Sequence, residues 1–180
     1  MQTVVSIVIF VAIFLFCWWS TKFKITDIQL SYWGVEEKLG PLWNISIMLM
    51  SISIYINAAF FLQHHKRLLY FRSFYWWFAI VSLLLFIVGF VPMHNRLHDI
   101  TAALYFFLYP LVIFCLAHLN RKHMLYREWV GHVAISVSMV LAPAILLHFF
   151  KGMAISEAIH TTIVILWNIW LLRDTNNTEA

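Results

Sequence analysis

Titratable side chains are concentrated in one short stretch of an otherwise apolar sequence, residues 88–107. This stretch carries His94, Arg96, His98 and Asp99 between two long apolar runs. Imidazole and carboxylate groups are the usual ligands of Zn²⁺, and they also act as general acids and bases. His94 and His98 are four residues apart, so they would share one face if this stretch were helical. Any chemistry is therefore expected here first.

A second group of titratable residues follows later in the chain and consists of His148, Glu157 and His160. Glu157 and His160 are three residues apart near the start of a predicted helix, so they would share a face. Ionisable groups within a membrane are costly and are functional candidates by default. The two groups together predict a polar ligand site, or alternatively a metal or catalytic site. The candidate catalytic residues are His94, His98, Asp99, Glu157 and His160, and the candidate ligands for zinc or a similar metal are His94, His98, His148 and His160.

Structural roles are equally open to these residues. Asp99 can cap the helix that follows it, and Glu157 in a first helical turn can complement the helix dipole. Histidines at a membrane interface often combine an apolar body with a wet tip. The sequence contains neither an HExxH pattern nor a nucleophile elbow. Whether the protein is an enzyme stays open at this level.

The composition places these residues in a membrane protein. Of the 180 residues, 63% are hydrophobic and 11% are charged, with a mean hydropathy of +0.83. Soluble domains have about 25% charged residues. The apolar residues form six blocks, each long enough to cross a hydrocarbon core of about 30 Å as a helix. This pattern predicts an all-α polytopic membrane protein with six transmembrane helices in one compact bundle, residues 1–174. The predicted spans are 3–19, 43–62, 74–93, 101–118, 130–150 and 155–172, with an outer interfacial loop at 20–42 and a flexible polar tail at 175–180.

Basic residues predict the orientation. The connections after the second and fourth predicted spans hold six Lys and Arg residues, whereas those after the third and fifth hold two. The positive-inside rule then puts both termini in the cytoplasm. The net charge of +4 is accounted for by these loops, so no nucleic-acid partner is expected. The residues expected to contact anionic lipid headgroups are Lys66, Arg67, Arg72, Arg121 and Lys122.

Two pairs of residues bear on cofactors and cavities. His118 and His132 lie at similar depth in consecutive predicted spans, so a haem held by both is an alternative. The basic loops beside them favour plain interfacial side chains, and no cofactor is expected. Pro110 and Pro143 interrupt the fourth and fifth predicted spans, where each frees a backbone carbonyl and permits a kink. Two such kinks could open a lipid-sized cavity.

Four short motifs follow one another along the first half of the chain. They are Leu30-Ser31-x-x-Gly34, Leu42-Trp43-Asn44, Gly89-x-x-Pro92 and Leu97-His98. In these motifs the chain resembles the bacterial membrane family catalogued as domain of unknown function 998 and its FRAG/DRAM/Sfk-type six-helix relatives. It departs from that pattern at Val91, where a Phe normally precedes the proline, and in a fuller first loop. The resemblance implies a six-helix bundle in a bacterial cytoplasmic membrane, motifs on the non-cytoplasmic side and a link to lipids, without an established activity. The family-type residues are Ser31, Gly34, Asn44, Pro92 and His98.

We therefore expect an integral membrane protein that binds or senses lipid, or serves as accessory subunit of a membrane complex, through an outward-facing polar pocket. The alternative is an intramembrane lipid-modifying enzyme, a hydrolase or acyl transferase, that uses the His/Asp/Glu cluster with or without a metal. The expected partners are membrane lipids and, in the accessory case, another membrane protein. The residues expected to line the pocket are Ser31, Trp33, Asn44, Pro92, Arg96, His98 and His148.

Overall fold

A computed structural model describes residues 2–20, 30–35, 37–150 and 153–177, and every regular element in that part of the chain is helical. Within these ranges, side chains are described from Val8 to Leu171, with the exception of Ser31. Much of the predicted interfacial loop and the last residues of the predicted tail lie outside the described residues. The elements are α1 (Gln2–Ser20), the short 3₁₀ helix η1 (Leu30–Val35), α2 (Gly40–His64), α3 (Phe71–Phe90), α4 (Arg96–Leu119), α5 (Tyr126–Phe149) and α6 (Ala154–Asn177).

Five of these helices, α2 to α6, are long and apolar enough to cross a membrane, α6 through its part Ala154–Leu171. In α1 the part with described side chains, Val8–Ser20, is apolar but shorter than a span. The prediction of a helical multi-pass membrane protein is therefore confirmed in its class. The α6 helix continues to Asn177, into the region expected to be a polar tail.

The hinge between α3 and α4 is set by two local signals. Val91 has an extended backbone (φ −96°, ψ 128°), as a residue before Pro92 should, and α3 ends one residue earlier. Asn95 caps α4, because its side-chain oxygen accepts the Leu97 N–H at 2.9 Å. The α4 helix thus begins at Arg96, ahead of the predicted start at residue 101. Residues 91–95 are not helical. His94 and His98 therefore do not share one face of a helix, as they would if the hinge were helical.

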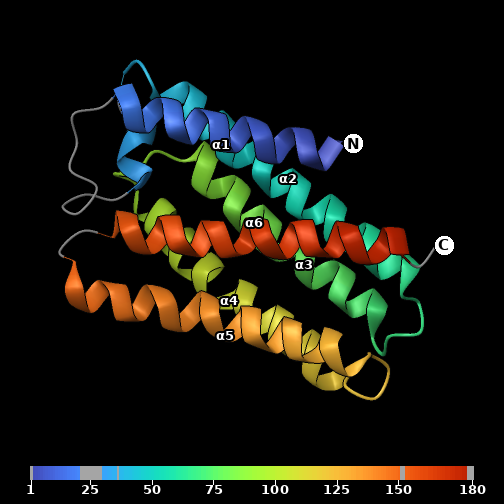
Figure 1. Cartoon of the computed structure of the whole chain (residues 1–180). Helices are drawn as coiled ribbons and strands as arrows, with labels where there is room; N and C mark the ends of the chain where they lie inside the picture. The colour runs from blue at the N-terminus through green and yellow to red at the C-terminus, as the bar shows by residue number, and fades with distance from the viewer. Residues whose placement is uncertain (1, 21–29, 36, 151–152, 178–180) are drawn as a thin grey trace.

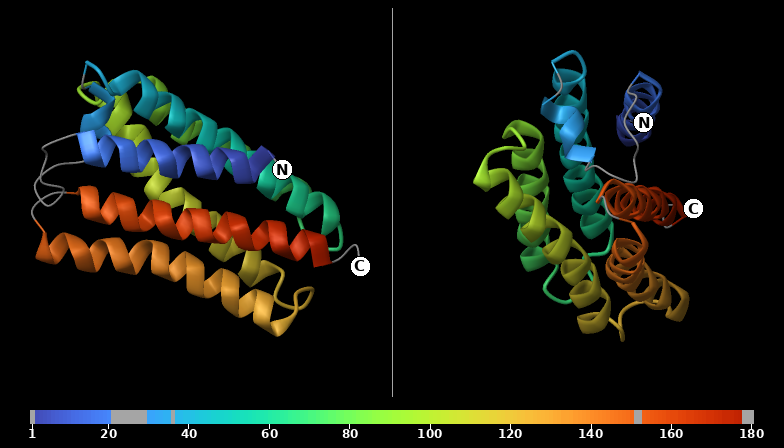
Figure 2. Two further views of the ribbon diagram at one scale, coloured as in Figure 1. Left: turned by 45° about the horizontal axis from the view of Figure 1, so that its top comes forward. Right: turned by 90° about the vertical axis from the view of Figure 1, so that its left-hand side faces the viewer.

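The bundle is built around α2, which packs against α1, α3, α6 and η1. The helices α3, α4 and α5 each pack against the next helix in the chain. In the views of Figures 1 and 2, α1 lies at one edge beside α2, and α5 lies at the opposite edge beside α4 and α6. Of the five apolar helices, α5 has the smallest buried share, as an edge helix facing lipid should.

The two ends of the bundle differ in the segments they carry. The start of α1, the end of α6 and the α2–α3 and α4–α5 connections lie at one end, which we call the basic end (Figure 1). The opposite end, the hinge end, carries η1, the hinge between α3 and α4, and the α5–α6 connection. The start of α1 and the end of α6 therefore lie at the same end as Lys66, Arg67, Arg121 and Lys122 of these two connections.

Large aromatic side chains fill the interior. Trp167 is completely buried and stacks on Phe78 of α3 with ring centroids 5.6 Å apart. Tyr109 of α4 meets the same indole edge-on at 5.7 Å. Rings from α3, α4 and α6 thereby close the centre of the bundle, where each contributes substantial buried apolar area.

Candidate functional site at the hinge end

His98 is buried and forms a hydrogen bond across the hinge between α3 and α4. Its Nδ1 lies 2.9 Å from the carbonyl oxygen of Val91, to which it donates a hydrogen bond. That carbonyl belongs to Val91, the extended residue before Pro92. A histidine in the first turn of α4 is placed to reach it. Since Nδ1 carries the proton, Nε2 carries the lone pair.

The other hinge residues face outward. His94, Arg96 and Asp99 are exposed, as is Pro92. The interpretation of Asp99 as the helix cap is replaced by the Asn95 cap, and Asp99 lies in the first turn of α4. A carboxylate there still complements the helix dipole. The cluster of titratable residues at positions 94–99 therefore consists of one buried imidazole, that of His98, and exposed neighbours.

His160 is buried in α6 and compensates for a proline. Pro143 has no N–H to give to the carbonyl four residues earlier, that of Met139. The Nδ1 of His160 lies 3.1 Å from this carbonyl oxygen and supplies the missing donor. Its Nε2 is buried and has no hydrogen-bond partner among the described residues. The ring packs edge-on against Phe106 at 4.6 Å.

The four histidines proposed as metal ligands are not brought together. His98 and His160 are buried on different carbonyls, while His94 and His148 are exposed. Within the described part of the chain, no group of three or more His, Cys, Asp and Glu side chains is placed to hold one metal ion. The separation follows from the non-helical hinge and from His148 facing outward near the end of α5.

Glu157 has a structural contact in the first turn of α6. Its Oε2 accepts the backbone N–H of Leu30 at 2.6 Å, which ties the start of η1 to α6. A carboxylate at a helix N-terminus is also favoured by the helix dipole. Glu157 therefore fastens the 3₁₀ helix across the hinge end.

Asn44 of α2 contacts two glycines of the quoted motifs, Gly34 of η1 and Gly89 of α3. Asn44 Nδ2 donates to the carbonyl of Gly34 at 3.1 Å, and a Cβ on that glycine would clash with Asn44 Oδ1. A Cβ on Gly89 of α3 would lie 2.9 Å from the carbonyl oxygen of Asn44. Only glycine allows both approaches. These motif residues thus explain how η1, α2 and α3 pack at the hinge end.

Beside this contact lies a cluster of aromatic rings from α1, η1 and α2. Trp33 and Trp43 are each 2% exposed and meet edge-on with ring centroids 5.0 Å apart. Phe14 of α1 packs on both, at 5.6 and 6.3 Å, and also reaches Trp18 at 6.0 Å. Neither buried indole N–H has a hydrogen-bond partner in the part of the chain that the structure describes.

The basic end holds another buried histidine. His132 of α5 accepts the indole N–H of Trp167 at Nδ1, at 3.1 Å, and its ring lies 4.6 Å from that of Trp170. The proton of His132 is therefore on Nε2, the nitrogen that would have to be free to ligate haem iron. His118 is exposed and stacks on Phe114 at 5.8 Å. The two residues of the haem alternative thus occupy different environments.

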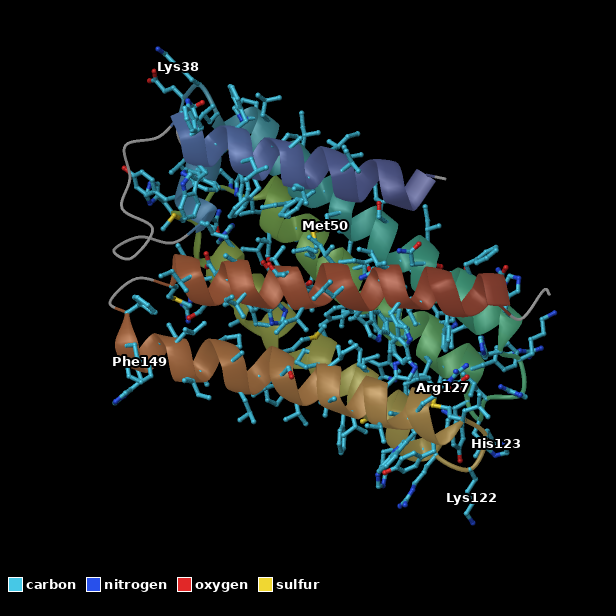
Figure 3. All side chains as sticks on the ribbon, in the orientation of Figure 1. Lys38, Met50, Lys122, His123, Arg127 and Phe149 are labelled. Carbon is cyan, nitrogen blue, oxygen red and sulfur yellow. The ribbon has the colours of Figure 1, made fainter. Side chains whose placement is uncertain are left out.

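The cations expected to meet lipid headgroups are exposed at the same end. Lys122 and His123 of the α4–α5 connection and Arg127 at the start of α5 project at this end, opposite the end that carries Lys38 and Phe149 (Figure 3). The guanidinium of Arg121 lies 4.6 Å from the ring centroid of Trp129, a cation–π contact. Exposed cations also occur in the other connection at this end: Lys66, Arg67 and Arg72.

Asn168 and Tyr109, which sequence reasoning did not single out, form a buried polar network with Asn57. Asn57 Nδ2 donates to Asn168 Oδ1 at 3.0 Å, and Asn168 Nδ2 donates to the carbonyl of Val164 at 2.8 Å. The same amide lies 3.4 Å from the hydroxyl of Tyr109. In the sequence, the signal for this network is the amide of Asn168, which lies between Trp167 and Trp170 in a predicted apolar span. This network joins α2, α4 and α6.

Comparison of the chain with known protein families, with curated proteins and with solved structures gave no match.

Proposed function

We propose that this chain is a six-span membrane protein that binds or senses lipid, or serves as an accessory subunit of a membrane complex, without catalysing a reaction. The observation that carries the proposal is that the buried and partly buried polar residues at the hinge end bind backbone groups of the protein itself. His98, Glu157 and His160 each contact a backbone group of another segment. Groups engaged in this way stabilise the fold and are poorly placed to exchange protons with a substrate.

The exposed residues support contact with lipid at both ends. Cations surround the basic end, and anionic headgroups attract such residues by about 1 kcal/mol for each Lys or Arg near the surface. In the proposed orientation this end and both termini face the cytoplasm. Arg96 and His148 are exposed at the hinge end, where they can meet headgroups of the outer leaflet.

The resemblance to the domain of unknown function 998 family and its relatives stays part of the proposal, as does a bacterial cytoplasmic membrane. Its support is that Asn44 lies close to both Gly34 and Gly89, two glycines of the quoted motifs. A shared set of close backbone approaches is what such a motif would preserve in a six-helix bundle.

One observation favours the alternative of an intramembrane lipid-modifying enzyme. The Nε2 of His160 is a buried lone pair with no partner among the described residues, as a general base would require. No carboxylate contact to His160 occurs in the described part of the chain that would orient it as in a catalytic dyad. We therefore favour binding over catalysis.

The proposal is tested by measuring which lipids stay with the purified protein. Native mass spectrometry of the protein in mild detergent, after incubation with phosphatidylglycerol or phosphatidylethanolamine, reports bound lipid directly. We expect retained lipid with a preference for phosphatidylglycerol. The preference should fall when the five cations named for headgroup contact are changed to Gln, and it should persist in the Lys38→Gln control. A wild-type protein that retains no lipid would refute the proposal.

A further inference from the structure

Two neighbouring indole N–H groups of the hinge end lack an acceptor. The Nε1 atoms of Trp33 and Trp43 are both buried, and neither has a hydrogen-bond partner within the described residues. Buried polar groups without a partner are uncommon and call for a ligand, a water or a functional explanation. The two rings are also in contact with each other, edge-on with their centroids 5.0 Å apart.

The surroundings select a neutral acceptor. The pair is lined by Phe10 and Phe14 of α1, with Phe10 at 5.8 Å from Trp43. The described contacts of the two indoles include no cation. A phosphate buried there would be a charge without a counter-charge, which is very costly, whereas a carbonyl oxygen needs only the hydrogen bond.

The position along the helix selects the source of that carbonyl. Trp43 lies in the first turn of α2, a helix long and apolar enough to span the membrane, and Trp33 lies in η1 beside it. Tryptophans at helix ends mark the boundary between headgroups and hydrocarbon. In a glycerolipid the ester carbonyls lie at this boundary, between the headgroup and the acyl chains.

One partly buried side chain, Phe14, separates the pair least completely from the surface of the bundle. Phe14 packs on both indoles and also contacts Trp18, which is exposed. The α1 helix, which carries Phe14, packs mainly on α2 at the edge of the bundle. An acyl chain lying along α1 could place its ester group at the indoles.

We propose that Trp33 and Trp43 form a donor site for the ester carbonyl oxygens of a membrane glycerolipid, entered past Phe14. This site rests on the proposed function, since it names the lipid atoms that the hinge end would bind. It differs from headgroup contact at the basic end, because it recognises the linkage between glycerol and acyl chain.

The test compares two lipids that differ only in this linkage. The ¹⁵N-labelled protein in maltoside detergent is titrated with dioleoyl phosphatidylglycerol or with its diether analogue, which has no carbonyl. The indole N–H resonances are assigned through Trp33→Phe and Trp43→Phe. We expect the resonances of both indole protons to shift downfield, and these shifts to saturate, only with the ester-linked lipid. Trp167 is the matched control, because its buried indole already donates to His132 and should not move.

Affinity gives a second readout that does not depend on the assignments. Loss of one such hydrogen bond should weaken diester binding roughly two- to tenfold in either Phe variant and leave diether binding unchanged. Equal shifts with both lipids would place the acceptor in the phosphate and overturn the ester site. Unchanged Trp33 and Trp43 resonances in a protein that retains diester lipid would overturn the site while leaving lipid binding in place.

Discussion

The hydrogen bond from His160 to the Met139 carbonyl predicts an energetic coupling between a histidine and a proline on neighbouring helices. The bond exists because Pro143 cannot donate to that carbonyl, and His160 supplies the donor from α6 at 3.1 Å. His160→Phe keeps a ring against Phe106 but leaves the carbonyl without a donor. An orphaned buried acceptor costs about 1–3 kcal/mol, so the variant should lose stability of that order.

Pro143→Ala supplies the test of this reasoning. Alanine restores an N–H at position 143, which can bond to Met139 within α5 as in any regular helix. In that background His160→Phe removes a donor that is no longer required, so its cost should fall. Interhelical hydrogen bonds in membranes contribute about 0.6 kcal/mol on average and up to about 1.7 kcal/mol, and the coupling energy should lie in this range.

The measurement is a double-mutant cycle of unfolding free energies. Reversible unfolding in mixed micelles with increasing sodium dodecyl sulfate, followed by circular dichroism, would give the four values. His148→Phe is the control, because this histidine is exposed on α5 and its replacement should change stability by less than about 0.5 kcal/mol. Strictly additive effects of His160→Phe and Pro143→Ala would refute the account of the freed carbonyl.

Two further variants test contacts at the hinge end and at mid-bundle. Gly34→Ala should destabilise the protein by about 1–3 kcal/mol, because its Cβ would clash with the side chain of Asn44, and Asn44→Ala should relieve most of that loss in the double variant. Asn168→Leu should cost about 1–3 kcal/mol by leaving Asn57 without its buried partner, measured by the same unfolding assay. Asn57→Leu in addition should recover part of this cost, and no recovery would contradict the interhelical bond.

The helical class could be predicted from the sequence because continuous apolar blocks determine it locally. The predicted spans overlap the observed helices, but the third, 74–93, runs past the end of α3 at Phe90 into the hinge, and other ends differ where polar residues extend a helix beyond its apolar part. Asn95 is an example, since it starts α4 ahead of the apolar run. The number of spans and their orientation stay predictions.

The candidate site was less predictable, because it depends on contacts between distant segments. The spacing of His94 and His98 indicated a shared face only for a helical hinge, but the Asn95 cap starts the helix at Arg96 and leaves His94 outside it. The bond from Leu30 to Glu157 joins residues 127 positions apart, which no local pattern reveals. His160 was predicted as a catalytic or metal-binding candidate near the start of a span, and neither its burial nor its partner on α5 was predicted.

The contacts of these histidines show why titratable residues in a membrane sequence need not indicate a reaction. Every backbone group within a bilayer must be satisfied by the protein itself, so a proline or an extended residue creates a demand for a side-chain donor. His98 and His160 meet that demand at Val91 and Met139. The residues that then carry functional information are those whose polar atoms remain without a partner. By that criterion the Trp33 and Trp43 indoles, which composition alone would assign to the apolar core, are stronger candidates for ligand contact than the exposed cluster around His94.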